Sequence, residues 1–124
     1  MTDKYLRAIK RAITDLIADL RNGVLKNYYG DLISVETVIN NATGQTIMDH
    51  YINRVLPWKD KIENRDEKFF LENKFIFVGL SPAKVEFYSQ YLSNPDNVED
   101  DDKELIFQHF DTMTEIAELY NKHK

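Results

Sequence analysis

The chain has 124 residues and a net charge of −5, and 43% of its residues are hydrophobic while 30% are charged. This length and balance predict one globular domain, residues 1–124, rather than a disordered segment. The absence of cysteine excludes disulfides, thiolate nucleophiles and cysteine-ligated metal sites. No apolar run approaches the roughly 20 residues of a membrane span, so we expect no membrane partner and a cytoplasmic location.

Apolar spacing predicts a first helix from about Thr2 to Asn22. Its stripe advances in steps of three and four residues: Leu6, Ile9, Ile13, Leu16, Ile17 and Leu20. Thr2 is a candidate N-cap, and Gly23 is a candidate C′ residue. The stripe covers less than three heptads, so we expect it to face the core of its own domain rather than a coiled-coil partner.

The same helix carries a cluster of cations near its N-terminus, made up of Lys4, Arg7, Lys10 and Arg11. Lys4, Arg7 and Arg11 lie three and four residues apart and so share one face. Cations at this end oppose the helix dipole by a few tenths of a kcal/mol per group. Either the face is simply solvated, or it meets an acidic surface. In the second case we predict contact with the acidic residues 96–102 of this chain or with an acidic partner.

The next segment is harder to interpret. Asn22-Gly23 fits a hairpin turn with extended residues after it, but residues 25–33 also fit a helical face. We predict a helix over residues 31–41, leave residues 24–30 open, and expect a loop from Asn40 to Gly44.

Three later segments have readable boundaries. Apolar spacing predicts a helix over residues 47–56, and Pro57 ends it. The only tryptophan, Trp58, follows at this break, and we expect its side chain to pack into the core. Residues 59–68 are charged and are expected to form a connection and the first turn of another helix, followed by an apolar run that includes Phe75. Ser81 as N-cap and Pro82 at the first helical position begin another helix, which ends near residue 94.

The last third contains an acidic segment, residues 96–102, followed by the clearest helix, residues 101–120. Its apolar face consists of Leu105, Ile106, Phe110, Met113, Ile116, Ala117 and Tyr120. Asp100, Asp101 and Asp102 suit the positive N-terminus of this helix. We predict them to be partner-binding residues together with the four cations of the first helix.

The known catalytic and ligand-binding patterns do not fit. The acidic segment lacks the Gly and Glu that a calcium-binding EF-hand needs at its sixth and twelfth positions. His50 beside Asp49, and His109 near Asp111, do not share a helical face. Four glycines and no phosphate-binding loop argue against nucleotide binding. We therefore predict no enzyme activity and no cofactor. The net negative charge argues against nucleic acid as a partner.

Three short patterns lie between residues 69 and 120: Phe75-x-x-x-Gly79-Leu80-x-x-x-Lys84-x-x-x-Tyr88, Asp102-Lys103-Glu104-x-Ile106 and Leu119-Tyr120. Together they resemble small helical proteins of large DNA viruses that have no assigned activity. The resemblance implies a viral protein, located in the host cytoplasm or the virion. It implies no site residues.

These observations predict an all-α fold, a compact bundle of five or six helices with the first and last helices in its core. The predicted function is a non-enzymatic protein-interaction or structural module whose partner is another protein or a second copy in a homodimer. The alternative is a small ligand-binding protein or enzyme with a pocket between helices, lined by aromatics such as Trp58, Tyr88 and Tyr91.

Overall fold

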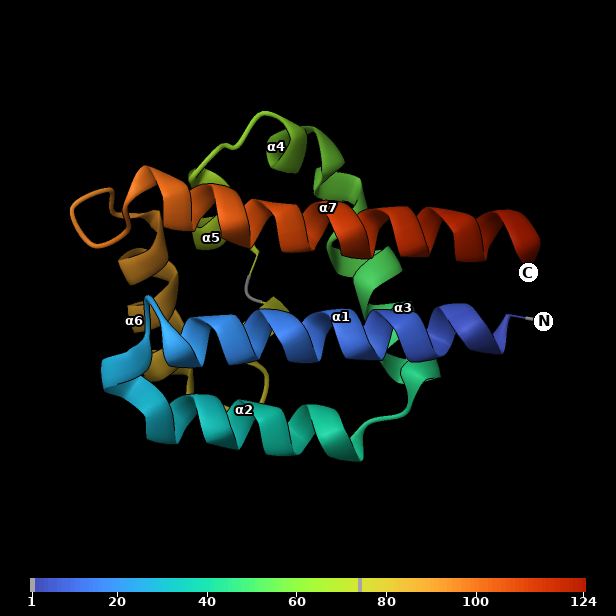
Figure 1. Ribbon diagram of the computed structural model, residues 1–124, viewed down its shortest axis with the longest axis horizontal. Coiled ribbons are helices and arrows are strands. Elements are labelled where there is room, and N and C mark those ends of the chain that lie inside the picture. The colour runs from blue at the N-terminus through green and yellow to red at the C-terminus, as the bar shows by residue number, and fades with distance from the viewer. Residues whose placement is uncertain (1, 74) are drawn as a thin grey trace.

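A computed structural model of the chain describes residues 2–73 and 75–124, with Phe75 described by its backbone alone (Figure 1). In this part of the chain there are α-helices and 3₁₀ turns but no strand, so the all-α prediction is confirmed. The α-helices are α1 (Asp3–Asn22), α2 (Tyr29–Asn41), α3 (Gly44–Arg54), α4 (Lys59–Glu63), α5 (Lys68–Glu72), α6 (Pro82–Ser93) and α7 (Asp100–His123). The 3₁₀ turns are η1 (Lys26–Tyr28), η2 (Leu56–Trp58) and η3 (Phe75–Phe77). The described residues thus form more helices than the five or six expected, because residues 59–72 form two separate five-residue helices.

Helix α1 has the predicted span and buries the predicted stripe, with only Leu6 left partly exposed. Thr2 lies at the N-cap position, but the prediction of a capping hydroxyl was wrong. Its backbone has helical φ and ψ of −83° and −10°, whereas a capping side chain needs extended backbone. The Thr2 carbonyl oxygen instead accepts from the amides of Tyr5 at 3.0 Å and Leu6 at 3.3 Å.

Helix α7 runs beside α1 in the opposite direction, so that the N-terminus of each helix lies near the C-terminus of the other (Figure 1). The rings of Tyr5 and His123 stack at 5.9 Å and join the two helices at one end. The predicted apolar face of α7 is buried except for Leu105, which is 45% exposed, and Ile116, which is partly buried. The expectation that the first and last helices form the core is confirmed.

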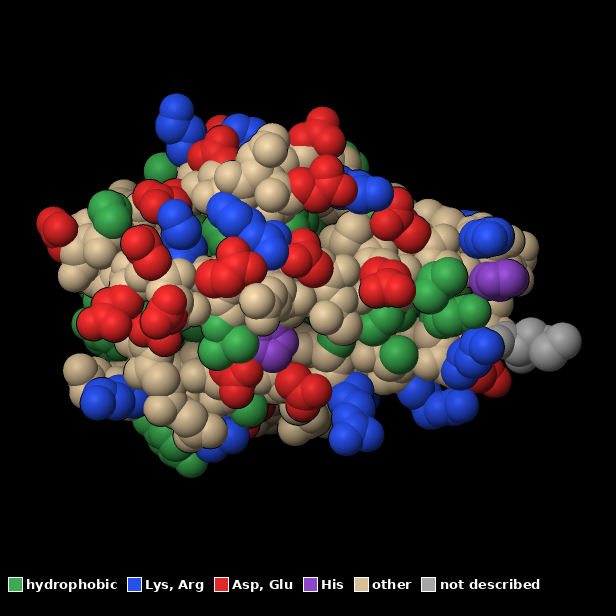
Figure 2. Space-filling model, turned by 45° about the horizontal axis from the view of Figure 1, so that its top comes forward, with side chains coloured by type: hydrophobic (Ala, Val, Ile, Leu, Met, Phe, Trp, Pro, Cys, Tyr) green, Lys and Arg blue, Asp and Glu red, His purple; other side chains and the backbone are tan. Residues whose placement is uncertain are grey.

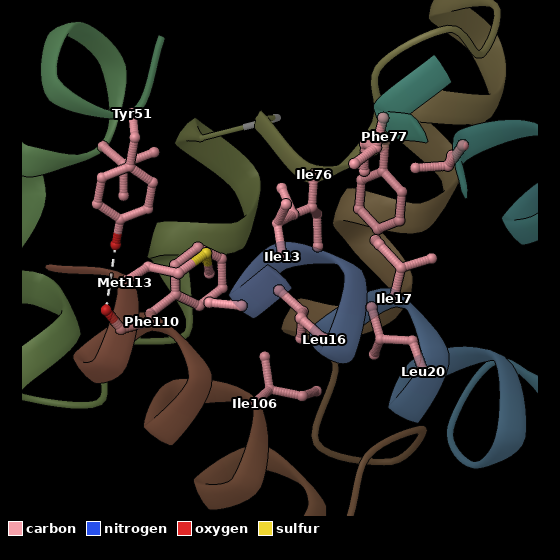
Figure 3. Packing of buried hydrophobic residues seen from close by; sticks show 14 of the residues in the cluster. Ile13, Leu16, Ile17, Leu20, Tyr51, Ile76, Phe77, Ile106, Phe110 and Met113 are labelled. Carbon is pink, nitrogen blue, oxygen red and sulfur yellow. Dashed lines mark hydrogen bonds between the residues drawn. The ribbon is translucent and has the colours of Figure 1, made fainter. Parts of the chain in front are cut away.

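The buried side chains form one continuous cluster between these helices and the shorter ones. Figure 3 shows Leu16 of α1 directed toward Ile106 of α7 within this cluster. The hydroxyl of Tyr51 on α3 donates to the carbonyl oxygen of Phe110 at 3.1 Å and lies 2.8 Å from Thr114 Oγ1. These buried hydrogen bonds fix α3 against α7, and the low-dielectric surroundings strengthen them.

The segment left open, residues 24–30, forms η1 followed directly by α2, and the hairpin alternative was wrong. Helix α2 begins at Tyr29, two residues before the predicted start at residue 31, and includes Gly30. Leu25 is fully buried beneath this turn, and its backbone N–H donates a hydrogen bond to the Leu20 carbonyl oxygen at 2.8 Å. The buried Leu25 explains why the chain turns here instead of extending away from α1.

The remaining boundaries largely follow the sequence. Ser81 Oγ accepts from the amide of Lys84 at 3.3 Å, and Pro82 starts α6, as predicted. Helix α3 ends at Arg54, earlier than predicted, and Pro57 lies inside η2. Trp58 packs against the core cluster from a partly buried position. The Phe75 side chain, expected in the apolar run, lies outside the described residues.

Arg65 holds the connection between α4 and α5 against α7. Its guanidinium makes two-pronged ion pairs with Glu104, at 2.9 and 3.0 Å, and with Asp111, at 2.7 and 3.0 Å. The two carboxylates raise the pKa of Arg65, and the Arg65 hydrogen bonds lower the pKa of Glu104. Arg65 also has a φ of 53°, a left-handed backbone conformation that only glycine adopts without strain.

Candidate partner-binding surface

The outward side of the first half of α1 is a basic face, defined here by Lys4, Arg7 and Arg11. All three side chains are exposed. Within the described part of the chain, none of them forms a hydrogen bond or an ion pair, and Lys4 Nζ only approaches the ring of Tyr5 at 5.0 Å. Several cations elsewhere do have partners, as Lys59 has in Glu118 and Lys103 in Glu67, each at 2.8 Å. The basic face therefore keeps its charge free for an external group.

Lys10, the fourth predicted cation, has a structural role as well. Its Nζ donates to the carbonyl oxygens of Asn40 at 3.1 Å and Ala42 at 2.8 Å. These carbonyls belong to the end of α2, where backbone acceptors lack helical partners. Lys10 thus closes the C-terminus of α2 and ties it to α1.

The three acidic candidates lie at the other end of the molecule. Asp100, Asp101 and Asp102 form the first turn of α7 and lie near the C-terminal end of α1, because the two helices are antiparallel. The axial distance from Arg7 to Asn22, where α1 ends beside these acids, is about 22 Å at the usual helical rise. The basic face cannot pair with residues 96–102 of its own chain, so the intramolecular branch of the prediction was wrong.

The cations of the basic face and the acids of α7 lie on separate parts of the surface. Figure 2 shows Lys and Arg side chains along the lower right edge, over the first half of α1, and a concentration of Asp and Glu at the left, over the start of α7. The C-terminal turn of α7, with Lys122 and His123, adds further basic groups at the same end as the basic face.

A surface hollow of about 310 Å³ lies beside the basic face, between α1 and the start of α3. It is lined by Asp3, Leu6, Arg7, Lys10, Thr43, Gly44 and Gln45. The two helices approach closely here, since a Cβ atom on Gly44 would lie only 2.7 Å from the Leu6 carbonyl oxygen. Arg7, Lys10 and the positive end of α3 favour a carboxylate in this hollow, while Asp3 opposes one.

A second hollow, of about 210 Å³, lies at the acidic end between α1 and α7. It is lined by Asp19, Leu20, Asn22, Gly23, Val24, Asp102, Leu105, Ile106 and His109. We call it the acidic groove, because carboxylates of Asp19 and Asp102 border an apolar floor that includes the half-exposed Leu105. Such a lining suits a cationic side chain with a long aliphatic stem.

The acidic groove contains a His–Asp pair that the sequence did not reveal. His109 Nε2 lies 2.5 Å from Asp19 Oδ2, across 90 residues of sequence. Asp111, which lies two residues after His109 in the sequence and was expected on another face of the helix, instead binds Arg65. No spacing rule within one helix could have found the pairing with Asp19.

Among the described residues, the aromatics proposed for a ligand pocket make separate contacts. Tyr88 and Tyr91 lie in a ring cluster with Tyr28 and Phe87, whereas Lys61 Nζ lies 5.6 Å from the centroid of the Trp58 ring. The Tyr88 hydroxyl donates to Asp31, which also accepts from Lys84 Nζ at 2.8 Å. Hydrogen bonds from Lys84 and then Tyr88 lower the pKa of Asp31, while burial and the Asp31 contact raise the pKa of Tyr88.

Within the described residues there is no group of three or more His, Cys, Asp or Glu side chains placed to hold a metal ion. No helix in the same part of the chain is both long and apolar enough to cross a bilayer. Comparison with protein-family models, with curated proteins and with solved structures found no match. The function is therefore inferred from the geometry of the molecule itself.

Proposed function

We propose that the protein is a non-enzymatic interaction module, a compact helical bundle that binds an acidic protein partner through Lys4, Arg7 and Arg11. From the resemblance of residues 69–120 to viral proteins, we also propose that this module acts in the host cytoplasm or in a virion.

The observation that supports the proposal is a charge arrangement that the fold does not compensate. Lys4 and Arg7 occupy the first turns of α1, where cations oppose the helix dipole by a few tenths of a kcal/mol each. The antiparallel α7 ends here with Lys122, which adds like charge, while Asp3 supplies an acid in the first turn of α1. Departures from local rules of this kind are expected where a surface serves binding rather than folding. An acidic partner removes both unfavourable interactions.

Protein is favoured over nucleic acid because the basic face is small. A polyanion long enough to cross the molecule would meet the acids at the start of α7 and an overall charge of −5. A folded partner with a local acidic patch meets the basic face alone.

The test is fluorescence anisotropy with a labelled peptide made only of glutamate, at about 50 mM salt, where exposed charges are weakly screened. We expect wild-type protein to bind it and R7E/R11E to bind at least about tenfold more weakly. The matched control is K26E/K68E, which changes the net charge equally at exposed cations outside the basic face. Equal weakening by both double variants would show a nonspecific charge effect and refute the assignment of the basic face.

A further inference from the structure

The two oppositely charged hollows are complementary to each other. We infer that copies of this chain associate head to tail, with the basic face of one copy docked on the acidic groove of the next. This inference rests on the proposed function and names its partner as a second copy.

The acidic groove has the lining that an arginine from a second copy requires. Its lining includes Asp102 and Asp19, and although Asp19 Oδ2 contacts His109, both carboxylates favour a guanidinium in the groove. Its floor includes Leu105, which is 45% exposed although it belongs to the apolar stripe of α7. The aliphatic stem of Arg7 or Arg11 covers this apolar surface while its charged group reaches the carboxylates. A single contact therefore accounts for both the unpaired arginines and the uncovered leucine.

The opposite hollow is complementary in the same orientation. Asp100 and Asp101 are exposed on the first turn of α7, beside the groove. When an arginine of the next copy occupies the groove, these carboxylates face the hollow that Arg7, Lys10 and the start of α3 line. Each copy thus supplies acids to one neighbour and cations to the other.

The positions of the two surfaces determine the symmetry of the assembly. A two-fold dimer that pairs the basic face with itself would oppose like charges. Because the basic face and the acidic groove lie at opposite ends of α1, their contact joins different surfaces of the two copies. Contacts of this kind build open chains unless the rotation between copies closes a ring. Association therefore grows with concentration, except where two antiparallel copies dock both contacts at once and close as a dimer.

The test is sedimentation velocity of wild type and two charge-reversed variants, R7E/R11E and D101K/D102K. At about 50 mM salt we expect the wild type to form species larger than a monomer, and at about 500 mM salt, where exposed charges are screened, to revert to monomer. Each variant alone should be monomeric, because its two ends then carry the same charge. An equimolar mixture should form a complex, because the first variant keeps its acidic groove and the second keeps its basic face.

Several results would overturn the inference: a monomeric wild type at low salt and high concentration, or a mixture in which the two variants do not associate. Lysines in the first turn of α7 weaken that helix, so circular dichroism is recorded for each variant, and D101N/D102N serves as the milder second variant. D101N/D102N should self-associate more weakly than the wild type. If the glutamate peptide binds the basic face while the protein itself remains monomeric, the proposed function is supported and the inference of self-association is refuted. Binding of a single-stranded oligonucleotide in preference to both would contradict the choice of a protein partner.

Discussion

Arg65 provides a sharp test of the fold, because its side chain stabilises the structure while its backbone is strained. Replacing it with alanine removes five hydrogen bonds, four to the carboxylates of Glu104 and Asp111 and one to the Ile62 carbonyl at 2.9 Å. Both carboxylates are 45% exposed, so solvent screening reduces each pair well below its buried value. The two-pronged geometry preserves part of the stabilisation that each ion pair provides. We expect R65A to lower the free energy of unfolding by about 2 kcal/mol.

The φ of 53° allows a comparison whose sign is unusual. Glycine in place of alanine normally lowers stability by about 0.5–1 kcal/mol because the unfolded chain gains freedom. At a left-handed position alanine keeps a strain of about 1–2 kcal/mol that glycine relieves. R65G should therefore be more stable than R65A, by about 0.5–1 kcal/mol. R65K should lie between wild type and R65A, because lysine keeps the charge but not the planar fork.

The assay is guanidinium unfolding followed by circular dichroism, with thermal unfolding as a check at about 4 °C per kcal/mol for a domain of this size. The difference between wild type and R65A should also depend on pH. Arg65 lowers the pKa of Glu104, so its stabilisation is complete above the ordinary glutamate range and is lost as the pH falls through the lowered pKa. R65A within about 0.5 kcal/mol of wild type at neutral pH, a value inside the range of ordinary surface substitutions, would refute the ion-pair account. R65G below R65A in stability would refute the backbone assignment.

Three further substitutions test contacts between helices. K10M should cost about 1 kcal/mol and speed amide hydrogen exchange at the end of α2, since two carbonyls lose their donor; unchanged exchange there would show that the contact is dispensable. G44A should cost about 1–3 kcal/mol, because its Cβ would lie 2.7 Å from a backbone oxygen of α1, and a neutral effect in chemical denaturation would mean that the helices are not so close. Y88F should cost about 1 kcal/mol at neutral pH by removing a donor to Asp31. Because the pKa of Asp31 is lowered, this cost should shrink as the pH falls through that lowered pKa in a pH series of unfolding curves, and a cost that is constant with pH would contradict the Tyr88–Asp31 contact.

Much of the fold follows from local rules. The steps of three and four in α1 and α7 predict both helices and most of their buried residues, and the Ser81-Pro82 start needs no long-range information. Leu105 shows where periodicity stops being sufficient. It belongs to the α7 stripe, but α1 ends at Asn22 and leaves it uncovered at the acidic groove. Coverage depends on where the neighbouring helix ends, which spacing within α7 does not encode.

The candidate surface was predicted in its residues but not in its arrangement. The cations of α1 and the acids of α7 are visible in the sequence, yet only the antiparallel packing of the two helices shows that they lie at opposite ends. Contacts between residues far apart in the sequence could not be predicted from spacing either. The pairs of His109 with Asp19 and of Arg65 with Glu104 span 90 and 39 residues. Lys10 was predicted to bind a partner, whereas its ammonium group also closes α2, because the fold brings an unpaired helix end within its reach.

The most direct measurement is nuclear magnetic resonance of ¹⁵N-labelled protein during titration with the glutamate peptide at low salt. The account predicts that amide shifts concentrate in the first half of α1 and the first turn of α3, with Arg7 and Arg11 among the most affected residues. Shifts centred on the ring cluster of Tyr28, Phe87 and Tyr91, or no shifts at all, would contradict the claim that the unpaired cations of α1 form the binding surface.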